Sequence, residues 1–257
     1  MQAGPQALAI DGDWAVVVEG GRDGDLSVHG VYARRVSGGD RIEVATMAAD
    51  GTGPMPWPVL YDGVVNVQIV GSNAGLSLLA VDLASGTRST WSVPAPKGPM
   101  VRWGELLVWQ ATTGVAAFNL RTQRVVEVPQ QLTSIGESLL LASDGQTIVW
   151  QGNRAGSSWV RAYRSGWAAP KESVLPGEQL NPGLSSWGRY AVSFVAQRYW
   201  IVDVETGQYA PVTIEWGGAV VSGGLLATSE MATAKGGSAG LRELGLTNVP
   251  ALPACTR

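Results

Sequence analysis

Short runs of apolar, β-branched and aromatic residues recur along the chain, each bounded by Gly, Pro, Asn, Asp or Ser. Runs of this length and composition predict β-strands. In the first stretch the pattern predicts four strands, at residues 8–11, 14–20, 29–36 and 41–48. The same arrangement returns five more times, and no stretch holds a helical period. The sequence therefore predicts an all-β chain made of repeated four-strand units.

Two sets of turn residues mark this repeat independently. Spacings of 51, 41, 41, 43 and 35 residues separate the turns after the first strand of each unit, at Gly12, Gly63, Gly104, Gly145, Gly188 and Gly223. Spacings of 47, 37, 43, 41 and 41 residues separate the turns after the third strand, at Gly39, Gly86, Gln123, Gly166, Gly207 and Asn248. Gly and Asn suit these positions because tight hairpin turns require a positive φ. Both sets count six units.

A period of roughly 40 to 50 residues made only of strands is typical of a β-propeller. We predict one domain over residues 1–257, a single six-bladed β-propeller with four antiparallel strands per blade. The predicted blades cover approximately residues 8–51, 56–98, 99–131, 135–177, 182–214 and 217–254. Because the first unit starts with its first strand and the last unit ends with its fourth, we expect the ring to close without strand exchange.

Composition excludes several classes of partner and site. The net charge is −3 and the pI about 5.2, so a basic face for a phosphate backbone is not expected and nucleic acid is excluded as a predicted partner. Cys255 is the only cysteine, which excludes an internal disulfide and a CxxC site. Apolar runs are far shorter than the ~18 residues that a membrane span requires. We expect a monomer without a membrane span.

The start of the chain lacks the basic and apolar regions of a signal peptide. The first repeat begins so abruptly that we expect Met1 to be an added start after a removed signal. This reasoning favours an extracytoplasmic location, periplasmic or secreted, and leaves a cytoplasmic one open.

Three segments, at residues 16–39, 106–123 and 147–166, look alike. They resemble the repeat of TolB-like (WD-repeat-like) β-propellers, in which a hydrophobic-Trp strand precedes a short loop and an aromatic-x-x-D-L-x-T-G strand and turn. Residues 78–86 and 199–207 carry the second half of that repeat. The resemblance is specific for fold. It implies a bacterial extracytoplasmic module that binds proteins or sugars, and some members of that group are fused to enzymes.

Several polar and aromatic residues have a structural interpretation. Asp82, Asp203 and Asn119 precede the turn after the third strand, where such side chains accept backbone N–H bonds. Trp109 and Trp150 share one position in the second strand of neighbouring units, which predicts packing between blades. The GGSAG segment at 236–240 matches a hydrolase motif that needs a strand-to-helix turn, so here it predicts only a flexible loop.

With the turns assigned in this way, the loops after the second strand and the connections between blades all lie at one end of a propeller. We call this end the loop-rich face. Its mixture of aromatic and hydrogen-bonding side chains suits contacts with proteins or sugars. The alternative is that these are ordinary solvated loops. The candidate binding residues are Arg22, Asp23, Asp25, His29, Trp57, Asn73, Arg154, Asn181, Arg198 and Lys235.

His29 is the only histidine, so a site that requires two is excluded. With Asp23 or Asp25 it could form an acid/base pair or, with carbonyl groups, a loose calcium site. The loop does not match EF-hand spacing, and two carboxylates are few for a hard cation. A solvated loop is the simpler interpretation, and we predict no metal, no cofactor and no catalytic residue.

Two functions remain after these exclusions. The leading hypothesis is a non-catalytic binding module that recognises a protein or carbohydrate ligand through the loop-rich face. The alternative is an enzyme, a hydrolase or lyase, that acts in the channel on a carbohydrate or ester. Channel chemistry requires at least two converging ionisable groups. The carboxylates beside the first set of turns fall on the opposite face, which counts against the enzyme; they are Asp11, Asp13, Asp62, Glu105 and Asp144.

Overall fold

The computed structural model describes residues 5–20, 28–71, 76–178, 183–212, 217–230, 240–249 and 252. The chain divides into two compact units, Met1–Met100 and Val101–Arg257. The single domain and its six blade boundaries stay predictions.

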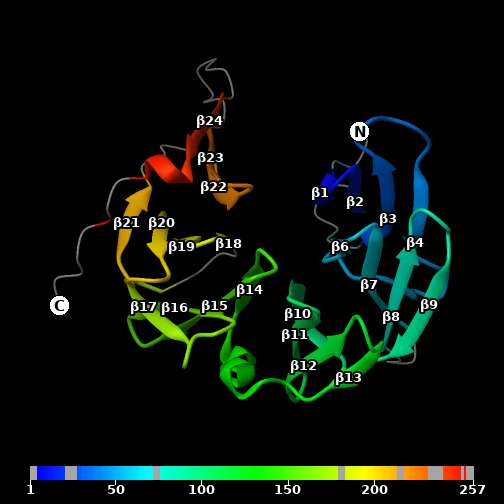
Figure 1. Cartoon of the computed structure of the whole chain (residues 1–257), viewed down its shortest axis with the longest axis horizontal. Coiled ribbons are helices and arrows are strands. Elements are labelled where there is room, and N and C mark those ends of the chain that lie inside the picture. The colour runs from blue at the N-terminus through cyan, green and yellow to red at the C-terminus, as the bar shows by residue number, and fades with distance from the viewer. Residues whose placement is uncertain are drawn as a thin grey trace. The chain divides into compact units, whose positions relative to one another are not determined.

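The first unit contains two antiparallel sheets, drawn in blue and cyan in Figure 1. The first sheet runs in the order β1 (Pro5–Asp11), β2 (Trp14–Gly20), β3 (Val28–Arg35) and β4 (Ile42–Thr46). In the second sheet, β5 (Gly53–Pro54) and β6 (Val59–Tyr61) both pair with β7 (Val64–Val70), followed by β8 (Leu76–Asp82) and β9 (Arg88–Ser92). The first sheet is a meander in which neighbours in sequence are neighbours in space, whereas in the second sheet β5 and β6 pair with β7 and not with each other.

Four further sheets follow in chain order. The third holds β10 (Pro96–Trp103), in which the division between the units falls, β11 (Leu106–Ala111), β12 (Gly114–Asn119) and β13 (Arg124–Val126). The fourth holds β14 (Leu140–Ser143), β15 (Thr147–Arg154), β16 (Ser157–Arg164) and β17 (Lys171–Pro176). The fifth holds β18 (Leu184–Trp187), β19 (Tyr190–Val195), β20 (Arg198–Asp203) and β21 (Tyr209–Val212). The sixth holds β22 (Gly217–Ser222), β23 (Leu225–Glu230) and β24 (Gly240–Gly245).

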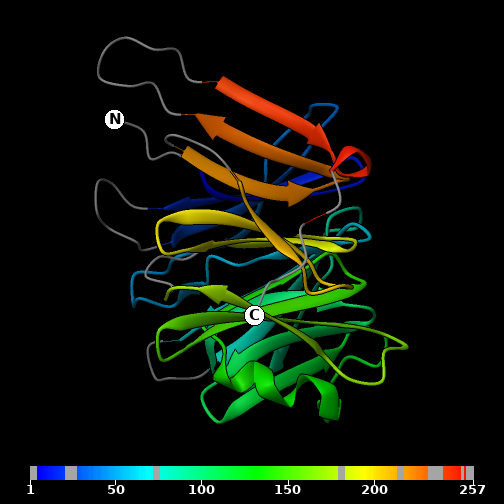
Figure 2. The same cartoon turned by 90° about the vertical axis from the view of Figure 1, so that its left-hand side faces the viewer.

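Neighbouring sheets of the second unit cover each other's apolar faces. Figure 2 shows the fifth sheet, in yellow, layered against the sixth, in orange and red. Strand β15 is buried on both sides: Ile148 and Trp150 pack with the third sheet, while Val149 packs with Ala191 and Val202 of the fifth. A strand buried on both faces has consecutive apolar residues in its sequence, as Ile148, Val149 and Trp150 are. Trp109 and Trp150 are both fully buried, as their shared position predicts.

The predicted turns lie where the sequence places them except at Asn248, which ends a 3₁₀ helix and is not followed by a described strand. Each glycine of the first set has a positive φ, and in the second set even Gln123 adopts a φ of 55°. Asp82, Asn119 and Asp203 each accept backbone N–H groups two and three residues ahead, at distances from 2.8 to 3.3 Å. The interpretation of these three side chains as turn acceptors is confirmed.

Carboxylates of the first turns also bind the next sheet. The Asp11 carboxylate accepts the N–H of Asp62 at 2.6 Å in the first unit. The Asp144 carboxylate accepts the N–H of Gly188 at 2.6 Å in the second. These bonds fasten the turn of one sheet to the turn of its successor, so the carboxylates have a structural role.

Three features differ from the sequence prediction. The connection at residues 130–137 forms a 3₁₀ helix, η1 (Gln130–Glu137), whose Leu132 and Ile135 are buried in the core shared by the third and fourth sheets. Strand β5 was not expected. The fourth strand expected at residues 249–253 is absent from the described part of the sixth sheet, where the short 3₁₀ helix η2 (Leu246–Asn248) follows β24.

The sixth sheet therefore has three described strands, and six four-stranded blades are not confirmed. Val249 and Leu252 pack into the core between the fifth and sixth sheets. The spacing of turns in the sequence does not indicate this packing, because it does not specify which side chains of distant segments meet in the core.

One close approach in the fourth sheet depends on a missing side chain. Gly152 lies opposite Trp159 in the pairing of β15 with β16. A Cβ atom at position 152 would lie 2.2 Å from Cζ2 of Trp159, which is only 4% exposed. The indole therefore packs over bare backbone, an arrangement that also stabilises edge glycines in designed sheets.

We predict that Gly152→Ala lowers the free energy of unfolding by about 1–3 kcal/mol, the usual cost of overpacking a core. Urea denaturation at pH 7 measures the change. The same substitution in a Trp159→Leu background is the control, since the smaller side chain relieves the clash. An equal loss in both backgrounds would contradict the steric explanation.

Candidate functional site

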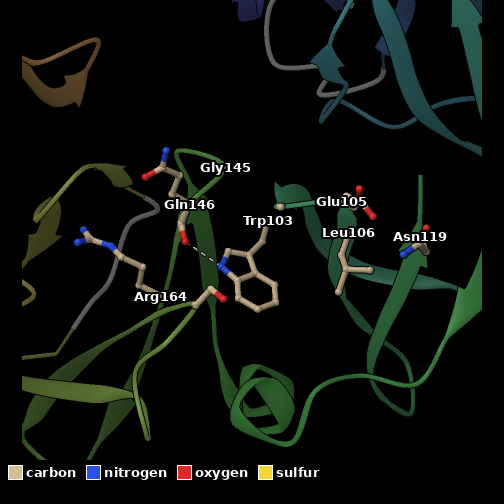
Figure 3. A pocket seen from close by; sticks show the side chains of 9 residues that line it. Trp103, Glu105, Leu106, Asn119, Gly145, Gln146 and Arg164 are labelled. Carbon is tan, nitrogen blue, oxygen red and sulfur yellow. Dashed lines mark hydrogen bonds between the residues drawn. The ribbon is translucent and has the colours of Figure 1, made fainter. Parts of the chain in front are cut away.

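A cleft of about 570 Å³ lies in the second unit between the third and fourth sheets. Small-ligand pockets usually measure about 300–1,000 Å³. Figure 3 shows the cleft from close by. Its lining comes from the turns at one end of the two sheets, and consists of Trp103, Gly104, Glu105, Leu106, Asn119, Gly145, Gln146, Arg164 and Ser165.

Trp103, at the end of β10 in the third sheet, is hydrogen-bonded to the fourth sheet. Its indole N–H donates to the backbone oxygen of Gln146 at 2.9 Å, the dashed line in Figure 3. Next to it the N–H of Gly104 donates to the backbone oxygen of Gly145 at 2.7 Å. The Tyr163 ring lies 5.6 Å from the Trp103 ring, centroid to centroid. The indole is thus both a tie between sheets and a half-buried wall of the cleft.

The opposite wall is fixed by Asp144. One carboxylate oxygen accepts the N–H groups of Gln146 and Thr147, at 2.8 and 2.7 Å. This local turn presents the backbone oxygen of Gln146 to the Trp103 indole. Gly145 has a φ of +90°, and a Cβ atom there would lie 3.0 Å from Nη1 of Arg102. Both the backbone conformation and the space therefore favour glycine.

Asn119 and Glu105 line the cleft on the side of the third sheet. The Asn119 side-chain oxygen accepts two turn N–H groups, which fixes the orientation of the amide and directs its NH₂ group away from them. The backbone oxygen of Glu105 accepts the N–H of Leu120 at 2.8 Å. The Glu105 carboxylate itself is exposed.

Arg164 lines the cleft, but its guanidinium forms hydrogen bonds with the neighbouring fifth sheet. The guanidinium donates to the Thr147 hydroxyl at 3.0 Å, to the Glu205 carboxylate at 2.8 Å and to the Gly188 backbone oxygen at 2.8 Å. Figure 3 shows it pointing away from Trp103. Of the nine lining residues only Glu105 and Arg164 are ionisable at neutral pH, so the cleft does not present a pair of acid and base groups to a ligand.

Asp203 shows how charge stabilises the same end of the fifth sheet. Burial by itself would raise the pKa of this carboxyl, but hydrogen bonds from the Arg189 guanidinium, the N–H of Glu205 and Thr206 outweigh burial and lower it. Asp82 occupies the equivalent turn in the second sheet. Hydrogen bonds from Ser85 and Ala84 lower its pKa, without an arginine.

The structure describes only some of the candidate binding residues of the loop-rich face. Outside the described residues lie Arg22, Asp23, Asp25, Asn73, Asn181 and Lys235, as does the GGSAG loop at 236–239. His29 is placed only as part of the backbone of β3. Trp57 lies between β5 and β6 in the first unit and is half-buried. Their role stays a prediction.

Arg154 and Arg198 lie at the same end of adjacent sheets in the second unit. Arg154 ends β15 and pairs with Glu172 at 3.2 Å, while Arg198 begins β20 and is exposed. Glu178 joins the two turns, because its carboxylate accepts the N–H of Gly156 and its backbone oxygen accepts the N–H of Ala196. These two predicted residues are thus brought to one rim, at the opposite end of the strands from the cleft.

The sequence interpretation missed the cleft because it assigned the residues beside the turn glycines to the scaffold. That assignment is correct for Asp144, but Trp103 both ties the sheets and lines the cleft. The available signal was Trp in place of Asp before the glycine of the third unit, beside the exposed Glu105.

Among the described residues, no group of three or more His, Cys, Asp or Glu side chains is arranged to hold a metal ion. Within the same ranges no helix is long and apolar enough to cross a membrane.

No protein-family model matches the sequence, and no curated protein matches it. Solved structures do match. TolB from Acinetobacter baumannii is 14% identical with a TM-score of 0.52, and the match covers 84% of this chain and 57% of that TolB. AztD from Citrobacter koseri is 13% identical with a TM-score of 0.56, over 95% of this chain and 68% of AztD. An oligogalacturonate lyase in complex with manganese is 10% identical with a TM-score of 0.59, over 94% of this chain and 74% of the lyase.

Identity this low establishes the fold alone, which is that of a TolB-like β-propeller. The chain spans little more than half the length of the matched TolB. One matched protein is named for a reaction and the other two names state none, so the fold does not choose between binding and catalysis.

We predict that acid destabilises the protein partly through Asp203. Because its folded-state pKa lies below the unfolded value of about 3.9, the carboxylate contributes stability above that pH and loses it as the pH falls through the folded pKa. Asp203→Asn should therefore cost stability at pH 7, and the difference from the parent chain should shrink toward about pH 2. Urea titrations over this range measure it.

Asp82→Asn is the matched control, since Asp82 accepts the same turn bonds but has no arginine partner in its pKa shift. We expect a smaller effect with a weaker pH dependence. Identical pH profiles for the two variants would show that Arg189 does not cause the acid sensitivity.

Proposed function

We propose that the chain is a non-catalytic binding module that recognises a protein or carbohydrate ligand. The observation that supports this is the state of the ionisable groups at the cleft. Arg164 is already bonded to three acceptors, and none of the other described residues that line the cleft gives Glu105 a second ionisable group. General acid–base catalysis of glycoside or ester cleavage uses two such groups.

The cleft is preformed, because hydrogen bonds within the protein fix its walls. Trp103, Asp144 and Asn119 are all fixed by hydrogen bonds within or between the sheets. A site held rigid by such bonds loses little conformational entropy when a ligand binds. This rigidity supports recognition at the turn end of the third and fourth sheets. A second contact through Arg154 and Arg198, at the other end of the strands, is part of the proposal, and the role of Trp57 in the first unit stays a prediction.

We place this activity outside the cytoplasm and in a monomer. The location rests on the resemblance of the repeats to TolB-like modules.

The test uses defined ligands with two readouts. The purified chain is applied to a glycan array and to a peptide array, and each ligand that is retained is then incubated with the chain and weighed by mass spectrometry. We expect retention on at least one array and no change in the mass of the retained ligand.

Two outcomes would overturn the proposal. One is the absence of binding on both arrays when the protein is applied at micromolar concentration. The other is cleavage of a retained ligand that Glu105→Gln abolishes, since that would make Glu105 a catalytic residue.

A further inference from the structure

The cleft beside Trp103 has a composition that restricts its ligand, and this inference rests on the proposed binding function. Its exposed polar side chains are Glu105, Gln146 and Ser165, and Asn119 adds a fixed amide. Together they supply a carboxylate acceptor, amide donors and acceptors, and a hydroxyl that can do both. Figure 3 shows Gln146 on one side of Trp103, and Leu106, Glu105 and Asn119 on the other.

Charge argues against an anionic ligand. The only carboxylate among the nine lining residues, Glu105, would repel an anion, and the only guanidinium is bonded to Glu205 and turned away from Trp103. A ligand without net charge avoids both penalties.

Backbone geometry argues against an extended peptide. A peptide strand binds by pairing with free N–H and C=O groups along a sheet edge. Here the two turns that flank the cleft pair with each other, through Gly104 with Gly145 and through Trp103 with Gln146. The cleft instead combines apolar surface from Trp103 and Leu106 with hydrogen-bonding side chains around it, which is the usual composition of small-ligand pockets.

We propose that this cleft binds a neutral saccharide. A sugar ring presents C–H groups on its faces and hydroxyls around its edge. Trp103 supplies the apolar wall for one face, and Glu105, Asn119, Gln146 and Ser165 bind the hydroxyls. This is a different surface from the loop-rich face, at the other end of the strands.

The experiment is isothermal titration of the chain with maltose, cellobiose, lactose and chitobiose, and with digalacturonate as the anionic comparison. We expect at least one neutral disaccharide to bind more tightly than digalacturonate. Trp103→Ala should weaken that binding by about tenfold or more, the effect expected when a central aromatic contact is truncated. Glu105→Gln should weaken it by less, because an amide retains one acceptor oxygen.

Trp187→Ala is the matched control, since Trp187 precedes the turn glycine of the fifth sheet but does not line the cleft. We expect it to bind like the parent chain. If Trp103→Ala does not fold, Trp103→Phe and Glu105→Gln replace it, because the first keeps an aromatic ring and the second changes an exposed side chain.

The outcomes separate this inference from the proposed function. Ligands found only on the peptide array, or tighter binding of digalacturonate, would overturn the proposal of a neutral saccharide. The proposed function as a binding module would still stand. Equal weakening by Trp187→Ala and Trp103→Ala would overturn the position of the site. The absence of any ligand on either array would overturn both.

Discussion

A sheet with apolar side chains on both faces must be covered on both, because either face left in water would cost the free energy that folding gains. Strand β15 shows this constraint most directly, with Trp150 buried toward the third sheet and Val149 toward the fifth. Stacking of sheets follows from it. So does the position of the turns, because stacked sheets bring the ends of successive hairpins together.

Turns that meet in this way satisfy each other's polar groups. Asp144 accepts the N–H of Gly188 in the next sheet, and Arg164 donates to the backbone oxygen of the same residue. At the third sheet Trp replaces Asp at the equivalent turn position, and its indole N–H reaches the backbone oxygen of Gln146. The larger side chain also bonds the next sheet, as a donor where Asp144 is an acceptor, and it adds an aromatic wall, so a residue of the scaffold can also line a cleft.

The function proposed for the cleft follows from the same bonds. Hydrogen bonds to the fifth sheet use the guanidinium of Arg164, and bonds within its own turn orient the amide of Asn119, so few charged groups of the cleft remain to act on a ligand. What remains is a rigid surface with hydrogen-bonding capacity. Such a surface is better suited to recognition than to proton transfer.

Much of the local structure of this protein could be predicted from the sequence. Most strands, the positive-φ turns and the turn acceptors Asp82, Asn119 and Asp203 were predictable, because each depends on residues close together in the chain. Strand β5, the helix η1 and the end of the sixth sheet were not. The fold family was also predictable, since the repeat carries it. The tertiary structure alone decided that Trp103 meets Gln146, that Arg164 serves the fifth sheet, and that Val249 and Leu252 enter the core. These contacts join residues that are far apart in the chain, and they depend on how the sheets stack. The period of the turns in the sequence does not specify which side chains meet across stacked sheets.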